Sequence, residues 1–424
     1  MYDVFSLKDF KFPEGFIWGS GYAGHQVEGN NIHSQWWANE QKGWFEHKSG
    51  LACNSYELYQ TDIDLAHSLG HQAFRTSVEW SRVEPTEGHF DDEAVDHYVR
   101  LFAGLKEKGI KVFATMVHIA WPEWFQQIGQ FSEIENLKYF ERYLEYVVPK
   151  IAPYVDFWNV INEFNLGTNE QRIKEKANCL RFHARGYHII KKYSDKPVST
   201  AHALVQYMPY RPWDRWDVAM TELQDLRNHE FFFHAMRTGE IMFPCRDVEY
   251  DPEVKDTVDY WSVNCYVRSM IDSRRQWLDG ARYQHKELKM LDMEQFYLEE
   301  MYPEGLLAIL GRLRDKPIYI TENGCSCDDD RFRIVYLSLY WSALADAIRL
   351  GCDVRGYMYW ALMDNYEWGS FKPRFGLCDC DFETFVRTPK PSAYFYRDVI
   401  ANNGFSQEIL RKYLTELPSI GLKK

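Results

Sequence analysis

Short apolar runs rich in β-branched and aromatic residues recur along the chain, and most of them end abruptly in polar residues. A strand that is buried on both faces of a parallel sheet has this continuous apolar pattern. The pattern predicts eight strands, over residues 16–22, 73–78, 112–117, 155–163, 198–203, 260–266, 316–322 and 354–362.

Segments with apolar residues at helical spacing lie between these runs. One follows Asp91 and Asp92, which can cap its start, and it ends at Gly109. Two others cover residues 59–69 and 332–350, and each ends just before a glycine. Amphipathic helices therefore alternate with the predicted strands.

This alternation, without a block of strands alone, predicts parallel βα units. Eight such units close into a (β/α)8 TIM barrel, an α/β fold with right-handed crossovers. No repeat or linker-like segment interrupts the chain, so residues 1–424 are predicted to form a single domain. Residues 206–259 and 268–290 show no clear pattern and are predicted to be long βα loops over the C-terminal face.

Composition narrows the range of functions. The 424 residues are 46% hydrophobic and 26% charged, as in an ordinary soluble globular protein. The net charge of −13, without any basic stripe, argues against nucleic acid as a partner, because phosphates are bound by clustered Lys and Arg. An aromatic content of 17% suits sugar binding, since aromatic rings stack on sugar faces, although core packing accounts for most of these residues.

The start of the chain shows neither the basic nor the apolar segment of a signal peptide. No window approaches 18 consecutive apolar residues, so no membrane partner is predicted. Nine cysteines, an odd number without a regular spacing, fit free thiols in a reducing compartment better than a disulfide framework. We therefore predict a cytoplasmic protein.

Two of the predicted strands end in a glutamate, Glu163 after Asn162 and Glu322 after a threonine. The carboxyl ends of barrel strands meet at one face, where two carboxylates can cleave a glycosidic bond as nucleophile and acid. Arg75 and Tyr266, on other strands, are predicted to keep Glu322 ionised. Asn162 is placed to bind the sugar 2-hydroxyl. Taken singly, a glutamate after a strand is more often a helix cap or a solvated charge.

Several motifs, in order and each at a predicted strand end, resemble glycoside hydrolase family 1 over nearly the whole chain. They are Gly24–Gly29, Phe74–Arg82, His118, Asn162–Glu163, Asn264–Tyr266, Thr321–Gly324, Trp360 and Asp364–Trp368. The resemblance implies that Glu322 is the nucleophile, that Glu163 is the acid/base and that Tyr266 touches the nucleophile. It further implies that the glycone is held by Gln26, His118, Asn162, Trp360, Glu367 and Trp368, and that no cofactor is needed.

Three positions depart from the family pattern. Phe164 follows the acid/base where the family usually has proline, Ile119 stands where an aromatic residue is common, and Cys265 replaces an aromatic residue or histidine. None of them removes a catalytic group. They bear on the choice of substrate more than on the reaction.

Family members that act on 6-phosphoglycosides replace a Glu–Trp pair with serine, but here Glu367 and Trp368 are retained. An anionic Glu367 repels a phosphate and accepts hydrogen bonds from neutral hydroxyls. We therefore predict a retaining β-glycosidase for unphosphorylated β-glycosides. Its main activity is predicted to be that of a β-glucosidase, with β-galactosidase or β-fucosidase side activity. The alternatives are a 6-phospho-β-glycosidase, a transglycosidase, or a sugar-binding protein that has lost catalysis.

Two further clusters can be interpreted either as structural features or as metal sites. Cys325, Cys327, Cys378 and Cys380 follow the last two strands and offer four zinc ligands, but a single residue separates each pair, which favours free thiols. The acidic run 328–330 precedes a predicted helix and favours an N-terminal cap over a calcium site.

Overall fold

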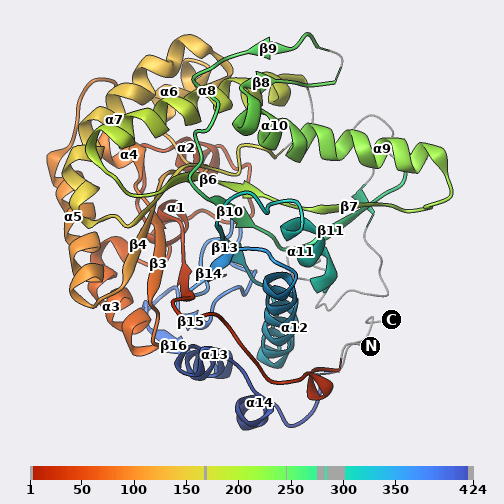
Figure 1. Cartoon of the computed structure of the whole chain (residues 1–424). Helices are drawn as coiled ribbons and strands as arrows, with labels where there is room; N and C mark the ends of the chain where they lie inside the picture. Colours follow the sequence, from red (N-terminus) through yellow and green to blue (C-terminus); the bar gives the residue numbers. More distant parts are fainter. Residues whose placement is uncertain (1–2, 167–169, 245, 275–281, 284–300, 419–424) are drawn as a thin grey trace.

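The computed structural model describes residues 3–166, 170–244, 246–274, 282–283 and 301–418. Eight parallel strands close into a barrel at its centre, each beside its neighbour in chain order, with helices around the outside (Figure 1). The strands are β2 (Ile17–Gly21), β3 (Ala73–Ser77), β4 (Lys111–Val117), β5 (Phe157–Asn162), β6 (Val198–Ala203), β10 (Trp261–Asn264), β13 (Ile318–Asn323) and β14 (Val354–Trp360). Each coincides with a predicted run, so the TIM barrel prediction is confirmed.

Helices and short strands make up the rest of the described structure. The α-helices are α1 (Gly24–Val27), α2 (Gln35–Gln41), α3 (Ser55–Ser68), α4 (Trp80–Val83), α5 (Asp92–Glu107), α6 (Glu123–Gln127), α7 (Leu137–Ile151), α8 (Glu170–Tyr193), α9 (Arg215–Asp225), α10 (Phe231–Thr238), α11 (Pro303–Leu310), α12 (Asp330–Arg349), α13 (Pro391–Asn402) and α14 (Gln407–Tyr413). The 3-10 helices are η1 (Val4–Ser6), η2 (Gln130–Ser132), η3 (Ile134–Asn136) and η4 (Ala152–Tyr154), and η5 (Leu226–Glu230) is a π-helix. The short strands are β1 (Phe10–Lys11), β7 (Gln206–Pro209), β8 (Glu240–Ile241), β9 (Glu249–Tyr250), β11 (Arg268–Ile271), β12 (Arg282–Tyr283), β15 (Cys378–Cys380), β16 (Arg387–Pro389) and β17 (Gly404–Phe405).

The helix ends follow the predicted capping chemistry. The Asp91 carboxylate accepts hydrogen bonds from the first free backbone N–H groups of α5, and Gly109 has the left-handed φ of +73° that lets the chain leave the helix. Asp329 caps α12 in the same way, through the backbone N–H of Arg331. The acidic run 328–330 therefore supplies the predicted N-terminal cap.

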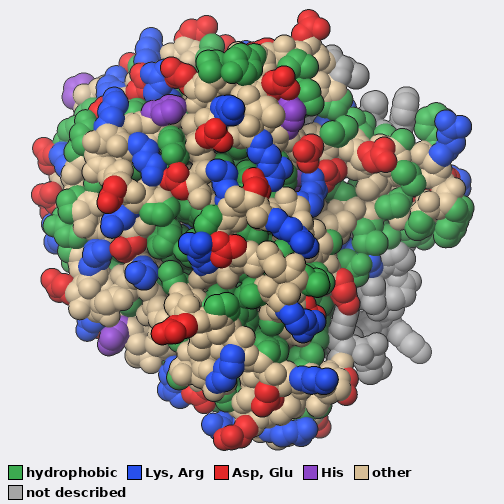
Figure 2. Space-filling view, in the orientation of Figure 1, with side chains coloured by type: hydrophobic (Ala, Val, Ile, Leu, Met, Phe, Trp, Pro, Cys, Tyr) green, Lys and Arg blue, Asp and Glu red, His purple; other side chains and the backbone are tan. Residues whose placement is uncertain are grey.

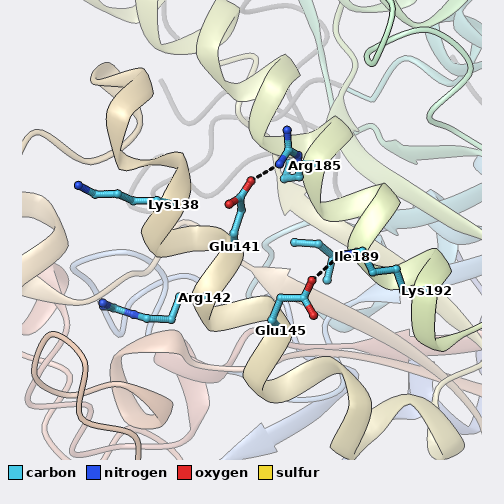
Figure 3. Close-up of a pocket in the computed structure, with 7 residues that line it drawn as sticks. All are labelled: Lys138, Glu141, Arg142, Glu145, Arg185, Ile189 and Lys192. Atoms are coloured by element: carbon cyan, nitrogen blue, oxygen red, sulfur yellow. Dashed lines mark hydrogen bonds and ion pairs between the residues drawn. The ribbon is translucent and has the colours of Figure 1, made fainter.

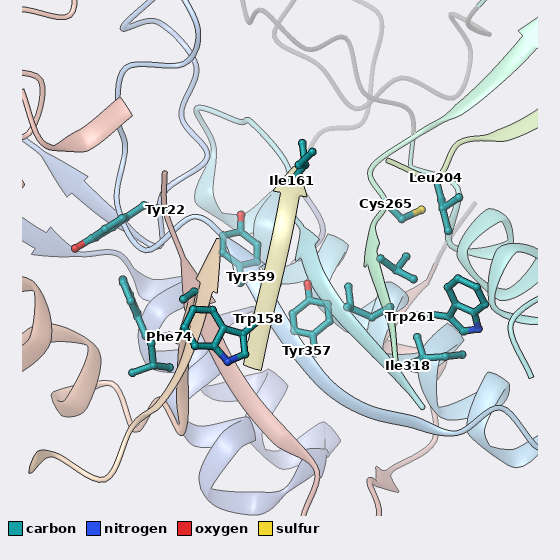
Figure 4. Close-up of a cluster of buried hydrophobic side chains, with 14 of the residues drawn as sticks. Tyr22, Phe74, Trp158, Ile161, Leu204, Trp261, Cys265, Ile318, Tyr357 and Tyr359 are labelled. Carbon is teal, nitrogen blue, oxygen red and sulfur yellow. The ribbon is translucent and has the colours of Figure 1, made fainter. Parts of the chain in front are cut away.

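The barrel is packed on both sides of its wall. On the outside, side chains such as Trp158, Trp261 and Tyr357 lie among the helices (Figure 4). On the inside, the ring of Phe113 on β4 lies 5.6 Å from the ring of Tyr319 on β13. These strands lie opposite each other around the barrel, so the two rings meet through its interior. The barrel is thus a filled core, as is usual for this fold.

Pairing irregularities interrupt three strands close to their carboxyl ends. They lie between residues 159 and 162 of β5, at residues 263–264 of β10, and between residues 320 and 323 of β13. A bulge changes the alternation of side chains between the two faces of a strand, and bulges are common beside active sites. The irregular ends carry Asn162, Asn264 and Glu322.

The prediction of loops over residues 206–259 is wrong in part, because α9, η5 and α10 lie there. The apolar residues of α10 begin with three consecutive phenylalanines, Phe231 to Phe233, which hide the helical period. Residues 268–290 begin with β11, which pairs with β7 in a small sheet, and this sheet and α9 project from one side of the barrel (Figure 1). Most of the rest of that stretch lies outside the described residues.

The surface shows mixed charge. On the face shown in Figure 2, Lys and Arg side chains are interspersed with Asp and Glu, and no large patch of one sign stands out. Among the described helices, none joins sufficient length with sufficient apolar character to cross a bilayer.

The close approach of β2 and β3 depends on a glycine, and this gives a stability prediction. A Cβ on Gly19 would lie 2.0 Å from the carbonyl oxygen of Ala73, which cannot move without breaking the barrel wall. We expect Gly19→Ala to lower the free energy of unfolding by about 3 kcal/mol. Gly311→Ala is the control, because its nearest neighbours would lie 3.4 Å away and its φ of −60° suits alanine. Urea unfolding midpoints that are equal for the two variants would contradict the prediction.

Candidate active site

The carboxyl ends of the barrel strands bring five polar side chains to one face of the molecule. They are Arg75 of β3, Asn162 and Glu163 at the end of β5, Asn264 of β10 and Glu322 of β13. All but Glu163 are buried in the barrel mouth, and Glu163 is partly exposed. Parallel strands that end at the same level explain why residues so distant in sequence meet here.

Glu322 is held by donors on both carboxylate oxygens. The Arg75 guanidinium donates to Oε1, and the Tyr266 hydroxyl donates to Oε2 over 2.6 Å. Nε2 of His118 lies 3.9 Å from Oε1. Arg75 and Glu322 are 1% and 4% exposed, so little solvent screens this ion pair. Charged and neutral donors therefore hold both oxygens of the Glu322 carboxyl group in place.

A continuous path of hydrogen bonds joins the two glutamates. Arg75, which holds Glu322, also donates to Oδ1 of Asn162 over 2.7 Å. The Asn264 amide donates to the same oxygen over 3.1 Å and to Oε1 of Glu163 over 2.8 Å. The predicted pair of carboxyl groups thus lies in one connected network at one end of the barrel.

Asn264 opens a motif named in the sequence analysis, but no role was predicted for its side chain. The Thr321 hydroxyl donates to its Oδ1 over 2.8 Å, which turns the amide NH2 group toward Glu163. Its signals in the sequence were its place at the end of a predicted strand and its membership of the Asn264–Tyr266 motif. Predicted site residues such as Asn162 and Glu322 also lie at the ends of predicted strands.

Glu163 lies in surroundings opposite to those of Glu322. Burial, followed by the negative charge of Glu322, raises the pKa of Glu163 to about 8, while the Asn264 hydrogen bond opposes this shift. Glu163 also has a left-handed φ of +51°, which is rare for residues other than glycine and clusters at functional sites. The next side chain, Phe164, is buried beside the rings of Phe231 and Phe232.

A second group of predicted residues lies beside this network. Gln26, on α1, donates through Nε2 to Oδ1 of Asn365 over 3.1 Å and to Oε2 of Glu367 over 3.0 Å. Its own Oε1 is buried and has no hydrogen-bond partner within the described residues. This end of the site therefore presents oxygen acceptors to a ligand.

Aromatic rings form one wall of the site. The ring of His118 stacks with the rings of Trp360 and Trp368, with centroid distances of 5.6 and 6.1 Å. Burial, together with the charge of Arg75, holds the pKa of His118 well below its usual range, so the ring is neutral. Trp36 also packs on Trp368, at 4.8 Å, and was not predicted, because it comes from α2 rather than from a strand end. The wall suits the flat face of a sugar ring.

The sequence model described as Glycosyl hydrolase family 1 matches residues 8–405. The chain belongs to this family. It is 28% identical to a 6-phospho-beta-galactosidase of Staphylococcus epidermidis, over 92% of this chain and 98% of that protein. The resemblance stated above is confirmed, and the protein is a glycoside hydrolase.

Solved structures of family 1 agree with the fold of this glycoside hydrolase. The beta-glycosidase from Pyrococcus horikoshii superimposes with a TM-score of 0.87 at 32% identity, covering 96% of this chain and 98% of the other. The family 1 β-glucosidase from Thermotoga maritima gives a TM-score of 0.84 at 25% identity, covering 93% and 99%. Both matches cover more than nine-tenths of this chain.

Two other features of this family 1 enzyme bear on whether the described residues contain a second site. Cys325, Cys327, Cys378 and Cys380 are buried and are not joined by disulfides, and the described part of the chain contains no group of three His, Cys, Asp or Glu side chains arranged to hold a metal. The zinc interpretation therefore finds no support. A depression between α7 and α8 on the outside of the barrel is lined by charges that pair with one another, such as Glu141 with Arg185 (Figure 3).

Proposed function

We propose that this family 1 enzyme is a retaining β-glycosidase for unphosphorylated β-glycosides, with β-glucosides as its preferred substrates. Glu322 attacks the anomeric carbon while Glu163 protonates the departing oxygen, which gives a covalent glycosyl-enzyme. Glu163 then acts as base and delivers water to the intermediate. Asn162, Gln26, His118 and the aromatic wall hold the glycone.

The contrast between the two carboxyl groups is the observation that carries this proposal. Glu322 accepts hydrogen bonds from Arg75 on one carboxyl oxygen and from Tyr266 on the other. Burial and the charge of Glu322 raise the pKa of Glu163 to about 8. Glu163 therefore stays protonated up to about pH 8, as a general acid requires. Two carboxyl groups with opposite environments mark the assignment of nucleophile and acid.

The acceptors at the glycone end support an unphosphorylated sugar. The free Oε1 of Gln26 and the carboxylate of Glu367 can each accept a hydrogen bond from a neutral hydroxyl, whereas a phosphate would be repelled by Glu367. Nearby cations already have anionic partners. Lys372 pairs with Glu46, and Lys390 lies 2.9 Å from a carboxylate oxygen of Asp364.

The second candidate function is a 6-phospho-β-glycosidase, which the name of the Staphylococcus epidermidis relative favours. A comparison of 4-nitrophenyl β-glucoside with its 6-phosphate separates the two. We expect kcat/KM to be at least roughly 100-fold higher for the plain glucoside, because a site built for hydroxyls rejects a charged group. Glucose, galactose and fucose versions of the plain substrate then rank the glycones. A higher kcat/KM for the 6-phosphate would identify the enzyme as a 6-phospho-β-glycosidase instead.

Transglycosylation uses the same intermediate and is tested in the same assay. Addition of a sugar acceptor at rising concentration partitions the glycosyl-enzyme between water and the acceptor. A hydrolase releases mostly free sugar at moderate acceptor concentration, whereas a transglycosidase releases mostly the longer glycoside. The ratio of nitrophenol to free sugar measures this partition.

A further inference from the structure

A cavity of about 90 Å³ lies directly beside Glu163. It is enclosed by the ends of β4 and β5, the segments that follow them, and the first half of α8. Its apolar walls include Ile119, Trp121, Phe131, Phe164, Leu166 and Cys179. Leu166 is 41% exposed and lies at the mouth, whereas Cys179 is buried at the far wall.

Two of the three departures from the family pattern line this one cavity. Ile119 stands where an aromatic residue is common, and Phe164 stands where proline is usual. A smaller side chain at position 119 leaves room beside the acid/base. Phe164 adds an apolar surface that proline could not supply. The departures thus change the shape and the polarity of the space next to Glu163.

The polar groups in the wall are engaged with one another. Oε1 of Glu175 accepts hydrogen bonds from Gln130 and from Ser132, both over 2.8 Å, and its other oxygen pairs with Arg172. The side-chain oxygen of Gln130 accepts from the backbone N–H of Phe131. A second sugar placed in the cavity would compete with these bonds, whereas an apolar group would leave them intact.

The size of the cavity also favours an apolar group over a second sugar. An apolar cavity of roughly 150 Å³ lined by Leu, Ile and Phe holds benzene, so one of about 90 Å³ is too small to enclose a pyranose ring. It can take a short, flexible hydrocarbon chain. Glu163 protonates the oxygen that carries the leaving group, and that group must therefore lie against Glu163 during the reaction.

We propose that the cavity binds the first carbons of an alkyl leaving group, so that simple alkyl β-glycosides are better substrates than disaccharides. This inference rests on the proposed function. In the reaction the bond between the anomeric carbon and the alkoxy oxygen breaks, Glu163 supplies a proton to that oxygen, and an alkanol leaves. Water then adds to the glycosyl-enzyme and returns the proton to Glu163.

The test measures kcat/KM for methyl and butyl β-glycosides, and for the matching disaccharide, with the glycone that the nitrophenyl panel ranks first. We expect the butyl glycoside to exceed the methyl glycoside by roughly 10- to 100-fold, because three more methylene groups are buried. Cys179→Leu fills the far wall and should lower this ratio at least about 5-fold while methyl glycoside hydrolysis is kept. Cys179→Ala, which adds no volume, is the matched control. Leu166→Trp, at a partly exposed position, should narrow the mouth of the cavity. It replaces Cys179→Leu in the test if that buried substitution impairs folding.

The inference is overturned if butyl and methyl glycosides react within about 2-fold of each other, if the disaccharide is preferred, or if folded Cys179→Leu and Leu166→Trp both keep the wild-type ratio. These outcomes leave the proposed function standing, provided that nitrophenyl β-glycosides are cleaved with retention. Absence of any β-glycoside cleavage would instead overturn both.

Discussion

Glu322→Ala is expected to lower kcat for 4-nitrophenyl β-glucoside by on the order of 10⁴-fold or more, as loss of a covalent nucleophile does in other enzymes. The substitution removes the carboxylate that both Arg75 and Tyr266 bind. It also leaves space beside the anomeric carbon. Added azide should enter that space and restore nitrophenol release, and the product should be the α-glycosyl azide, because a single displacement inverts the β configuration.

A buried carboxyl group outside the network provides the control. Glu79 is buried, and its oxygens accept hydrogen bonds from Ser77 and Asn31 instead. Glu79→Gln should therefore retain activity to within about 10-fold and show no response to azide. A β-configured azide from Glu322→Ala, or activity near that of the wild type, would remove Glu322 from the role of nucleophile. Circular dichroism on both variants separates loss of chemistry from loss of fold.

The sequence predicted the barrel well because each strand is a local pattern. The runs before Glu163 and Glu322 carry enough apolar residues in a row to be recognised without knowledge of their partners. Since all barrel strands end on one face, recognition of the strands also placed the polar residues that follow them. That is why Arg75, Asn162 and Tyr266 could be predicted together with the two glutamates.

What the sequence could not supply depends on register and on contacts between distant segments. The irregular end of β10 and the Thr321 hydroxyl together direct the Asn264 amide to Glu163, and neither is visible in a linear pattern. Trp36 reaches the aromatic wall from a helix far from any strand end. The cavity beside Glu163 likewise exists only after α8 has packed against β5. Residues at strand ends were therefore predictable, whereas their orientation and their neighbours were not.

Replacement of Glu163 should have the second largest effect, and the effect should depend on the leaving group. Glu163→Ala removes the proton donor, so we expect kcat/KM for alkyl β-glycosides to fall by about 10²- to 10⁴-fold. Dinitrophenyl glycosides need little protonation and should form the glycosyl-enzyme at a rate close to that of the wild type. Azide should then react with that intermediate and give the β-glycosyl azide, opposite in configuration to the Glu322→Ala product. Equal losses on both substrates would argue against a role as acid.

The pH dependence of Glu163→Gln tests the same assignment from a second direction. The pKa of Glu163 in the folded protein is raised to about 8, so wild-type kcat/KM should fall above about pH 8, and this limb should be absent from the variant. A raised pKa means that the folded state binds more protons than the unfolded state between the two pKa values. Its contribution to stability is therefore full below the ordinary glutamate pKa and is lost as pH rises toward 8. Urea midpoints measured at pH 5 and pH 8 should consequently fall more for the wild type than for Glu163→Gln. An identical fall would mean that burial and the charge of Glu322 do not hold the proton on Glu163, and the acid would have to be sought elsewhere in the barrel mouth.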